Sequence, residues 1–238
     1  MSLGESGMST VTHSDPTEGH TVKSLDYQLS ELRLQVVALG GLVINQVSTA
    51  VRALLNDDGV VAAQVLSREY DVNRLHQQIE RAVFELLALH QLMANDLRLA
   101  LGIRRISHEL ERAGDEAKKI ASFAQRLANG DSSNQASGPV GSVAIYLRHM
   151  ADLSVLMLRE AVRSLDENNL DLSANAIAKD MELDAEFADA LRRVFTLVMA
   201  GEPYLRATID TVFALKGLER IGDHGKNIAE QVNFIIQG

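Results

Sequence analysis

The sequence LERAGDEAKKIA at residues 110–121 is followed 108 positions later by LERIGDHGKNIA at residues 218–229. Eight of the twelve aligned residues are identical, which indicates that the chain contains an internal duplication. Duplicated segments fold alike because they bury the same apolar positions. The repeat therefore predicts two structural units with the same topology.

Apolar residues around both copies recur at steps of three and four, the spacing that places them on one face of an α-helix. Around the first copy they are Leu99, Ile103, Ile106, Leu110, Ala113, Ala117, Ile120, Ala124 and Leu127. The same pattern predicts helices over residues 25–56, from 60 to about 90, 95–128, 139–166, 170–200 and 203–236. The predicted fold is all-α, with six long helices forming two tandem three-helix bundles.

Short polar or glycine-containing segments separate the predicted helices. The longest, NGDSSNQASG at residues 129–138, is interpreted as the linker between a first bundle at 24–128 and a second at 139–238. Asp57-Asp58-Gly59 and Asn168-Asn169 are expected to end helices within each half. Residues 1–23 are polar and include a second methionine at Met8, so we interpret them as a disordered tail with an expression scar.

The composition of the 238 residues argues against several functional classes. There is no Cys, which excludes disulfides, thiolate metal sites and cysteine nucleophiles. A net charge of −9 and an aromatic content of 4% argue against nucleic acid as a ligand. The longest apolar run, at 36–44, is too short to span a membrane, so a cytoplasmic protein is expected.

Motifs of the common catalytic sites are absent from the sequence. It has no glycine-rich phosphate loop, no Gly-x-Ser-x-Gly and no His-Glu-x-x-His. No glutamate is followed by histidine three residues later, so the Glu-x-x-His pairs of di-iron helical bundles are missing too. We expect a protein that is not an enzyme.

The two Leu-Glu-Arg-x-Gly-Asp motifs, each late in a long helix, resemble those of the PhoU family of phosphate-signalling proteins. Further similar segments are Ala88-Leu89-His90, Asp96-Leu97-Arg98 and His224-x-x-Asn227-Ile228-Ala229-Glu230. The resemblance covers residues 25–237, including the duplication. It implies two three-helix bundles whose Glu/Asp-x-x-x-Asp motifs bind multinuclear clusters of iron or zinc.

The same resemblance implies a function. It predicts a negative regulator of phosphate uptake and phosphate-starvation signalling. The implied partners are the ATPase subunit of the phosphate ABC transporter and the phosphate-sensing histidine kinase. A homodimer is expected, with contact to the membrane only through these partners.

Four acidic motifs are the candidate metal ligands. Glu111 and Asp115, like Glu219 and Asp223, are four residues apart and lie on one helix face. The resemblance adds a motif on the second helix of each half, which supplies Glu69, Asn73, Asp180 and Asp184.

Counting from each turn of the antiparallel helices shows which motifs should lie level. Glu69 should lie level with Asp115, and Asn73 with Glu111. In the second half, Asp180 should lie level with Asp223, and Asp184 with Glu219. The motif residues of 95–128 and 203–236 point away from the apolar seam, and those of the second helix of each half fall nearer the edge of their apolar stripe. Any site is therefore expected on the outside of each bundle, in or beside a surface groove.

Two explanations of these carboxylates remain open. They are solvated side chains paired with Arg112 and Arg220, or they are ligands of a hard or borderline cation such as Mg, Mn, Ca or iron. Asn73 replaces an acidic residue, so the first site should bind metal more weakly. His108 is expected to be an ordinary surface residue, and His224 a contact to a neighbouring helix or an indirect ligand. The alternative function is a metal-free scaffold that docks a basic partner through its acidic face.

Overall fold

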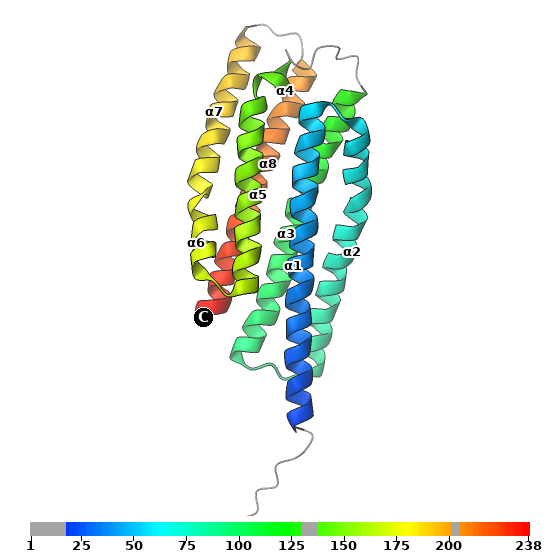
Figure 1. Ribbon diagram of the computed structural model, residues 1–238, viewed down its shortest axis with the longest axis vertical. Helices are drawn as coiled ribbons and strands as arrows, with labels where there is room; N and C mark the ends of the chain where they lie inside the picture. The colour runs from blue at the N-terminus through cyan, green and yellow to red at the C-terminus, as the bar shows by residue number, and fades with distance from the viewer. Residues whose placement is uncertain (1–17, 130–137, 201–204) are drawn as a thin grey trace, which may run out of the picture.

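The computed structural model describes residues 18–129, 138–200 and 205–238, and the side chains from residue 24 onward. The described residues form eight α-helices and no strand. They are α1 (Glu18–Asn56), α2 (Gly59–Leu89), α3 (Ala94–Ala128), α4 (Pro139–Ser142), α5 (Ala144–Glu167), α6 (Leu170–Ala178), α7 (Asp180–Met199) and α8 (Leu205–Gln237) (Figure 1). Most of the expected tail and linker, at 1–17 and 130–137, lies outside the described residues.

The predicted turns are confirmed, and side chains explain two of them. The Asp58 carboxylate caps α2 by accepting hydrogen bonds from the backbone N–H groups of Val60 and Val61. The Asn169 side chain caps α6 in the same way. Asn168 ends α5 with a φ of 49°, a left-handed conformation that asparagine tolerates better than most residues.

Two of the six expected helices are each divided. The expected helix 139–166 is α4 and α5, separated at Val143, whose φ is −116°. The expected helix 170–200 is α6 and α7, separated at Lys179, although the Leu183 N–H still donates to the Lys179 carbonyl (3.0 Å). Apolar residues continue through both points, so the sequence pattern did not reveal the breaks.

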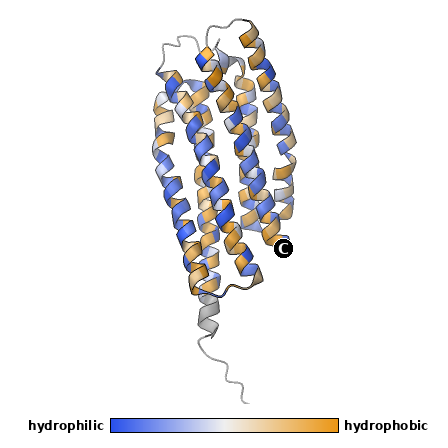
Figure 2. Cartoon of the chain, turned by 180° about the vertical axis from the view of Figure 1, so that it is seen from behind, coloured by the Kyte–Doolittle hydropathy of each residue, from blue (hydrophilic) through white to orange (hydrophobic). Residues whose placement is uncertain are grey.

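The two three-helix bundles lie side by side and share one core, which confirms the all-α fold class (Figure 1). Helices α1 to α3 form the first bundle, and α5 to α8, with α6 and α7 as one divided helix, form the second. Antiparallel pairs α3 with α8 and α1 with α5 join them, and Gly40 of α1 leaves room for Val162 of α5. Polar and apolar residues alternate along the helices (Figure 2), as expected for amphipathic helices.

Helix α1 requires a correction to the expectation that no segment could span a membrane. Its segment Ser24–Asn56 is long and apolar enough to do so by length and composition alone. However, Val36, Leu39 and Val43 are fully buried against the other helices. The high hydropathy of α1 therefore matches its place in the shared core, where it contacts both bundles.

Candidate functional site

The two copies of the repeated motif meet at the centre of the molecule. Because α3 and α8 are antiparallel neighbours, the residues around 110–115 of α3 lie beside those around 220–226 of α8. Arg220 Nη1 lies 3.0 Å from Glu116 Oε1, and His224 Nδ1 lies 2.8 Å from Glu109 Oε2. The duplicated halves are thus related by an approximate two-fold axis between these helices, which sequence alignment alone did not show.

In the second half, the structure brings together Asp180 and Asp184 of α7 and Asp223 of α8. Burial raises the pKa of Asp223, and the nearby charges of Asp180 and Asp184 raise it further. Lys226 Nζ donates to Asp180 Oδ2 (2.5 Å), and this hydrogen bond raises the pKa of Lys226. One lysine therefore offsets part of the repulsion among three carboxylates.

Glu219, the fourth expected ligand of the second half, has a lysine partner of its own. Lys216 Nζ lies 2.5 Å from its carboxylate, and the Glu219 side chain is only 13% exposed. Lys216 also lies over the ring of Phe187 on α7, 5.4 Å from its centre. The side chain of Glu219 is thus held in an ion pair within α8, one turn from Asp223.

In the first half, Glu69 of α2 and Asp115 of α3 lie close together, as their equal distances from the turn predicted. Lys118 Nζ lies 3.9 Å from Glu69 Oε1 and 3.8 Å from Asp115 Oδ1. The expectation that any site lies on the outside of the bundle is wrong at Glu69, which is only 4% exposed. Helix α1 covers it, and Gln46 Nε2 of α1 donates to Glu69 Oε2 (2.7 Å).

The environment of Glu69 disfavours its charged form. Burial raises the pKa of Glu69, and the neighbouring Asp115 raises it further, while Gln46 and Lys118 lower it in part. Its Oε1 atom is buried and accepts no hydrogen bond from the described residues. Burying a carboxylate that lacks some of its hydrogen bonds costs free energy of folding. Glu69 therefore destabilises the first bundle when it is charged.

Asn73 and Glu111 are both half-buried, and a polar groove of about 840 Å³ lies between α2, α3 and α8. Glu111 lines this groove together with His76, Glu80, Arg104 and His108. His108 is 57% exposed and its Nδ1 lies 4.0 Å from Glu111 Oε2, which agrees with a surface position.

The lysines that accompany these carboxylates were not predicted from the sequence. Lys118 and Lys226 occupy the same position of the repeated motif, and each lies next to the first acidic residue of the preceding long helix, Glu69 or Asp180. That shared lysine was the signal available in the sequence. Its pairing became visible only when the helices were placed.

His224 and Asn227 join the two bundles. Both side chains contact Glu109 of α3: His224 Nδ1 lies 2.8 Å from its Oε2 atom, and Asn227 Nδ2 donates to the same oxygen (3.0 Å). Burial alone would raise the pKa of Glu109, but these two hydrogen bonds outweigh it and lower the pKa. The expectation that His224 could contact a neighbouring helix is therefore met, and Asn227 has the same partner.

The carboxylate oxygens of the second half are suitable ligands for a cation, but the side chains are not arranged as a metal site. Carboxylate oxygens are the ligands that hard cations prefer. In residues 18–129, 138–200 and 205–238, however, no three Asp, Glu or His side chains are arranged to hold one metal ion. Lys216 and Lys226 take the places beside Glu219 and Asp180. A metal ion would have to displace these ammonium groups.

Comparisons with known proteins find the same family over both halves. The sequence model of the PhoU domain matches residues 36–124 and 147–232. The phosphate-specific transport system accessory protein PhoU homolog of Pseudomonas putida is 34% identical over 219 residues, covering 92% of this chain and 83% of the relative. The Pseudomonas aeruginosa homolog is 33% identical and covers 94% of this chain and 90% of the relative.

Solved structures agree with this result. The crystal structure of PhoU from Pseudomonas aeruginosa superposes with a TM-score of 0.83 and 33% identity, covering 90% of this chain and 99% of that one. The phosphate transport system regulatory protein PhoU from Streptococcus pneumoniae has a TM-score of 0.78 and 26% identity, covering 89% of this chain and 96% of that one.

Proposed function

Because this chain belongs to the PhoU family, we propose that it is an accessory protein of a phosphate-specific transport system and a negative regulator of phosphate-starvation signalling. The proposal depends on one observation, which is that both halves of the chain match the PhoU domain. The PhoU domain model covers 36–124 and 147–232, and relatives with the name of transport accessory protein align over 92% or more of the chain. The relatives are accessory proteins rather than enzymes, and this chain is not an enzyme.

An accessory protein that is not an enzyme regulates by binding. It shifts a partner between two conformations only to the extent that it binds one of them more tightly. We infer that the partners are the ATPase subunit of the phosphate ABC transporter and the phosphate-sensing histidine kinase. The protein would bind them on the cytoplasmic side of the membrane and would act as a homodimer. Two long bundles that share a core supply rigid surfaces for this purpose.

Deletion of the gene in its host tests the regulatory role. We expect phosphate-starvation genes to be expressed in the deletion strain even when phosphate is abundant, as measured with a transcriptional reporter. An inactive-transporter background should relieve any growth defect caused by unchecked uptake. Normal repression in the deletion strain, together with no binding to either partner at low salt, would overturn the proposal.

We further propose that the carboxylates of the second half bind a metal ion, with iron, zinc, Mg or Mn as candidates. Asp180, Asp184, Glu219 and Asp223 supply only oxygen atoms, and the raised pKa of Asp223 reflects burial and repulsion that a cation would relieve. In the first half, Glu69, Asn73, Glu111 and Asp115 carry one acidic residue fewer. Binding there should be weaker.

The metal content of the purified protein tests whether the second half binds metal and whether the first half binds it more weakly. The protein is purified without a metal-affinity column, and its bound metals are determined by mass spectrometry. Changing Glu219 and Asp223 together to Ala should remove most of the bound metal, whereas the same change at Glu111 and Asp115 should remove less. Unchanged content in the first variant would contradict the assignment, and equal losses in both would contradict the inequality of the halves.

A metal-free scaffold is the second candidate, and one observation favours it. The repeated lysines Lys118 and Lys226 already accompany Glu69 and Asp180, so protein ion pairs can account for the acidic motifs without a metal. In that case the acidic outer face would dock a basic partner. The test is to remove any metal with EDTA and to measure the affinity for the partners again. An unchanged affinity would support this alternative.

A further inference from the structure

Helix α1 has an exposed face without a charged side chain. No charged residue occurs between Arg33 and Arg52, and this stretch of 18 residues is the longest uncharged one in the sequence. At 1.5 Å per residue it extends about 27 Å along the helix. Among the described residues, no helix covers its outer side (Figure 1). The outer face of α1 consists of the exposed residues Leu34, Ala38, Gly41, Leu42, Asn45 and Ser48.

Burial within one chain explains only part of this composition. The most apolar 18-residue stretch of α1 is 44% buried, so more than half of it is not part of the shared core. A helix face that contacts solvent normally carries charged and polar residues. The outer face of α1 departs from this rule, which is expected if another surface covers it in the assembled protein.

The equivalent face of the second bundle follows the rule. The PhoU domain matches begin at residues 36 and 147, so an offset of 111 aligns α1 with α5. The exposed residues Ala38, Gly41 and Ser48 of α1 correspond to the exposed residues His149, Asp152 and Arg159 of α5. The two copies therefore differ at this face, although they share the same fold. Only the α1 copy has lost the charges that keep a helix face in water.

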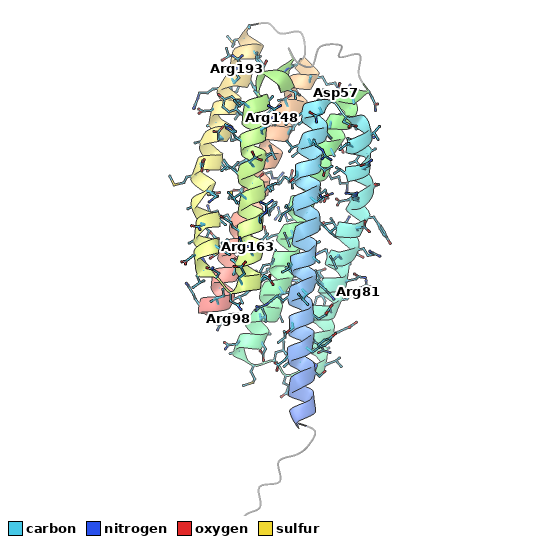
Figure 3. All side chains as sticks on the ribbon, viewed as in Figure 1. Asp57, Arg81, Arg98, Arg148, Arg163 and Arg193 are labelled. Carbon is cyan, nitrogen blue, oxygen red and sulfur yellow. The ribbon has the colours of Figure 1, made fainter. Side chains whose placement is uncertain are left out.

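Apolar side chains project from one end of α1, and a groove lies at its other end. Tyr27 and Leu34, which are 70% and 59% exposed, project from the first half of the helix. The groove, of about 370 Å³, lies between α1 and α5, and Figure 3 shows Arg148 of α5 on its far side and Asp57 at the nearby end of α1. The α1 side of the groove is formed by Ser48, Val51, Arg52, Leu55 and Asn56.

A second, antiparallel copy of α1 would bring these features together. If the Gly41 residues of two copies face each other, Leu34, seven residues before Gly41, faces Ser48, seven residues after it. Tyr27 and Leu55, each fourteen residues away from Gly41, also face each other. The apolar side chains of each copy then lie at the groove of the other, and a two-fold axis makes every contact twice. The face is thus complementary to itself.

Charges at the two ends of the face favour the antiparallel direction. The exposed acidic residues Asp26 and Glu31 precede it, the exposed Arg52 follows it, and Arg33 is half-buried. Parallel helices would place each of these charges against its own copy. In the antiparallel arrangement Arg52 faces Ser30, which is next to Glu31 and one turn from Asp26. Opposite charges therefore meet at both ends of the contact.

The net charge of the chain limits where two copies can meet. Two chains with a charge of −9 each repel one another, so their contact requires a surface without charge or with charges that complement each other. The outer face of α1 meets both conditions. Stable interfaces bury about 1,200–2,000 Å², more than one pair of helices supplies. Helices α5 and α2 lie on either side of α1 (Figure 1) and can extend the contact.

We propose that the outer face of α1 is the interface of a homodimer in which two α1 helices cross in antiparallel directions near Gly41. Gly41 has nothing within 4 Å of the space that a methyl group would fill, and Ala38 carries only a methyl group, so the helices can approach closely. The inference rests on the homodimer of the proposed function. It adds the surface, the direction of the helices and the chemistry of the contact.

Sedimentation velocity of the full-length protein over a range of concentrations tests the proposal. The wild type should sediment with twice the mass of one chain. Leu42, which is 41% exposed, lies beside the crossing point. Leu42→Glu would place two carboxylates close together across the two-fold axis and should raise the dissociation constant of the dimer at least about tenfold.

Leu101 of α3 offers a matched control, because it is 43% exposed and does not lie on α1. Leu101→Glu removes the same side chain and adds the same charge as Leu42→Glu. Its dissociation constant should stay within about twofold of the wild type, as expected for a surface change outside an interface. Circular dichroism and thermal unfolding check that both variants are folded.

Charge reversal tests the antiparallel direction. Arg52→Glu would face Asp26 and Glu31 of the other copy, so it should weaken the dimer about threefold or more. Adding Glu31→Arg to this variant restores a pair of opposite charges and should recover most of the lost affinity. A double variant that is no tighter than Arg52→Glu alone would contradict the antiparallel arrangement.

The outcomes separate this inference from the proposed function. A wild-type dimer that persists in Leu42→Glu overturns the α1 interface and leaves the homodimer standing. A wild-type monomer at every concentration overturns both, whereas the regulatory role depends on the deletion strain. If Leu42→Glu stays dimeric but no longer binds the ATPase subunit, or no longer binds phosphatidylglycerol vesicles that the wild type binds, another partner covers this face and the inference is wrong.

Discussion

Replacing the motif glycine Gly222 by alanine should destabilise the protein, although alanine is the better helix former. Gly222 lies inside α8, where α7 packs closest against it. A methyl group there would overlap Leu183 Cδ2 and lie 3.4 Å from Met157 Sδ. Leu183 is only 1% exposed, so its side chain cannot turn into solvent without giving up core contacts.

The size of the effect follows from two opposing contributions. Overpacking a tight core costs about 1–3 kcal/mol, because side chains and backbone must shift to make room. Alanine in place of glycine in a helix interior gains about 1 kcal/mol. The net loss in the free energy of unfolding should be about 1 kcal/mol, which lowers the melting temperature by roughly 2–4 °C for a chain of this size.

Gly41 offers the matched control, because it also lies inside a helix but has nothing within 4 Å of the space that a methyl group would fill. Gly41→Ala should therefore keep the helix gain without the packing cost and raise the melting temperature by roughly 2–4 °C. Thermal unfolding of the two variants by circular dichroism isolates the packing contribution as their difference. A Gly222→Ala melting temperature at or above that of Gly41→Ala would refute the reasoning.

Two pH-dependent predictions follow from the carboxylates of Glu69 and Glu109, both measured by thermal unfolding between pH 4 and 8 in EDTA. Because the pKa of Glu69 is raised in the folded state, its charge opposes folding at neutral pH, and that cost disappears as the pH falls to the unfolded value near 4.5. Glu69→Gln should therefore raise the melting temperature by roughly 1–3 °C at pH 7 and have less effect at pH 4.5; equal effects at both pH values would contradict this. The pKa of Glu109 is lowered by His224 and Asn227, so its stabilising contribution is present above pH 4.5 and is lost as the pH falls through the folded pKa. Glu109→Gln should lower the free energy of unfolding by about 1 kcal/mol at pH 7, which is less than for a fully buried charged hydrogen bond because the carboxylate is partly solvated. The difference from wild type should shrink toward pH 4. A loss of stability that is independent of pH would contradict this, because it would mean that the shape of the side chain matters and its charge does not.

The sequence contained most of the information that determines the fold, because helix formation depends on short-range patterns. The steps of three and four around Leu110 and Ile221 predicted long helices. The segments Asp57-Asp58-Gly59 and Asn168-Asn169 predicted breaks between helices, which the structure confirms. The duplication predicted two bundles of the same topology. The breaks at Val143 and Lys179 were missed because the apolar pattern runs through them.

The sequence also indicated which acidic residues could meet within each hairpin, because antiparallel helices of known turn position have a calculable register. Glu69 with Asp115, and Asp180 with Asp223, are neighbours in the structure as counted from the turns. The spacing of these residues does not determine which ligand they bind. Their metal ligation stays a prediction.

Only the tertiary structure decided how the two bundles meet and what surrounds each carboxylate. Burial and pairing depend on residues far apart in the chain, so no local pattern predicts them. Gln46 reaches Glu69 because α1 packs against α2 and α3, and His224 reaches Glu109 because α8 packs against α3 across the two halves. The charge and exposure of the candidate site are therefore properties of helix packing, which the periodicity of a single helix does not contain.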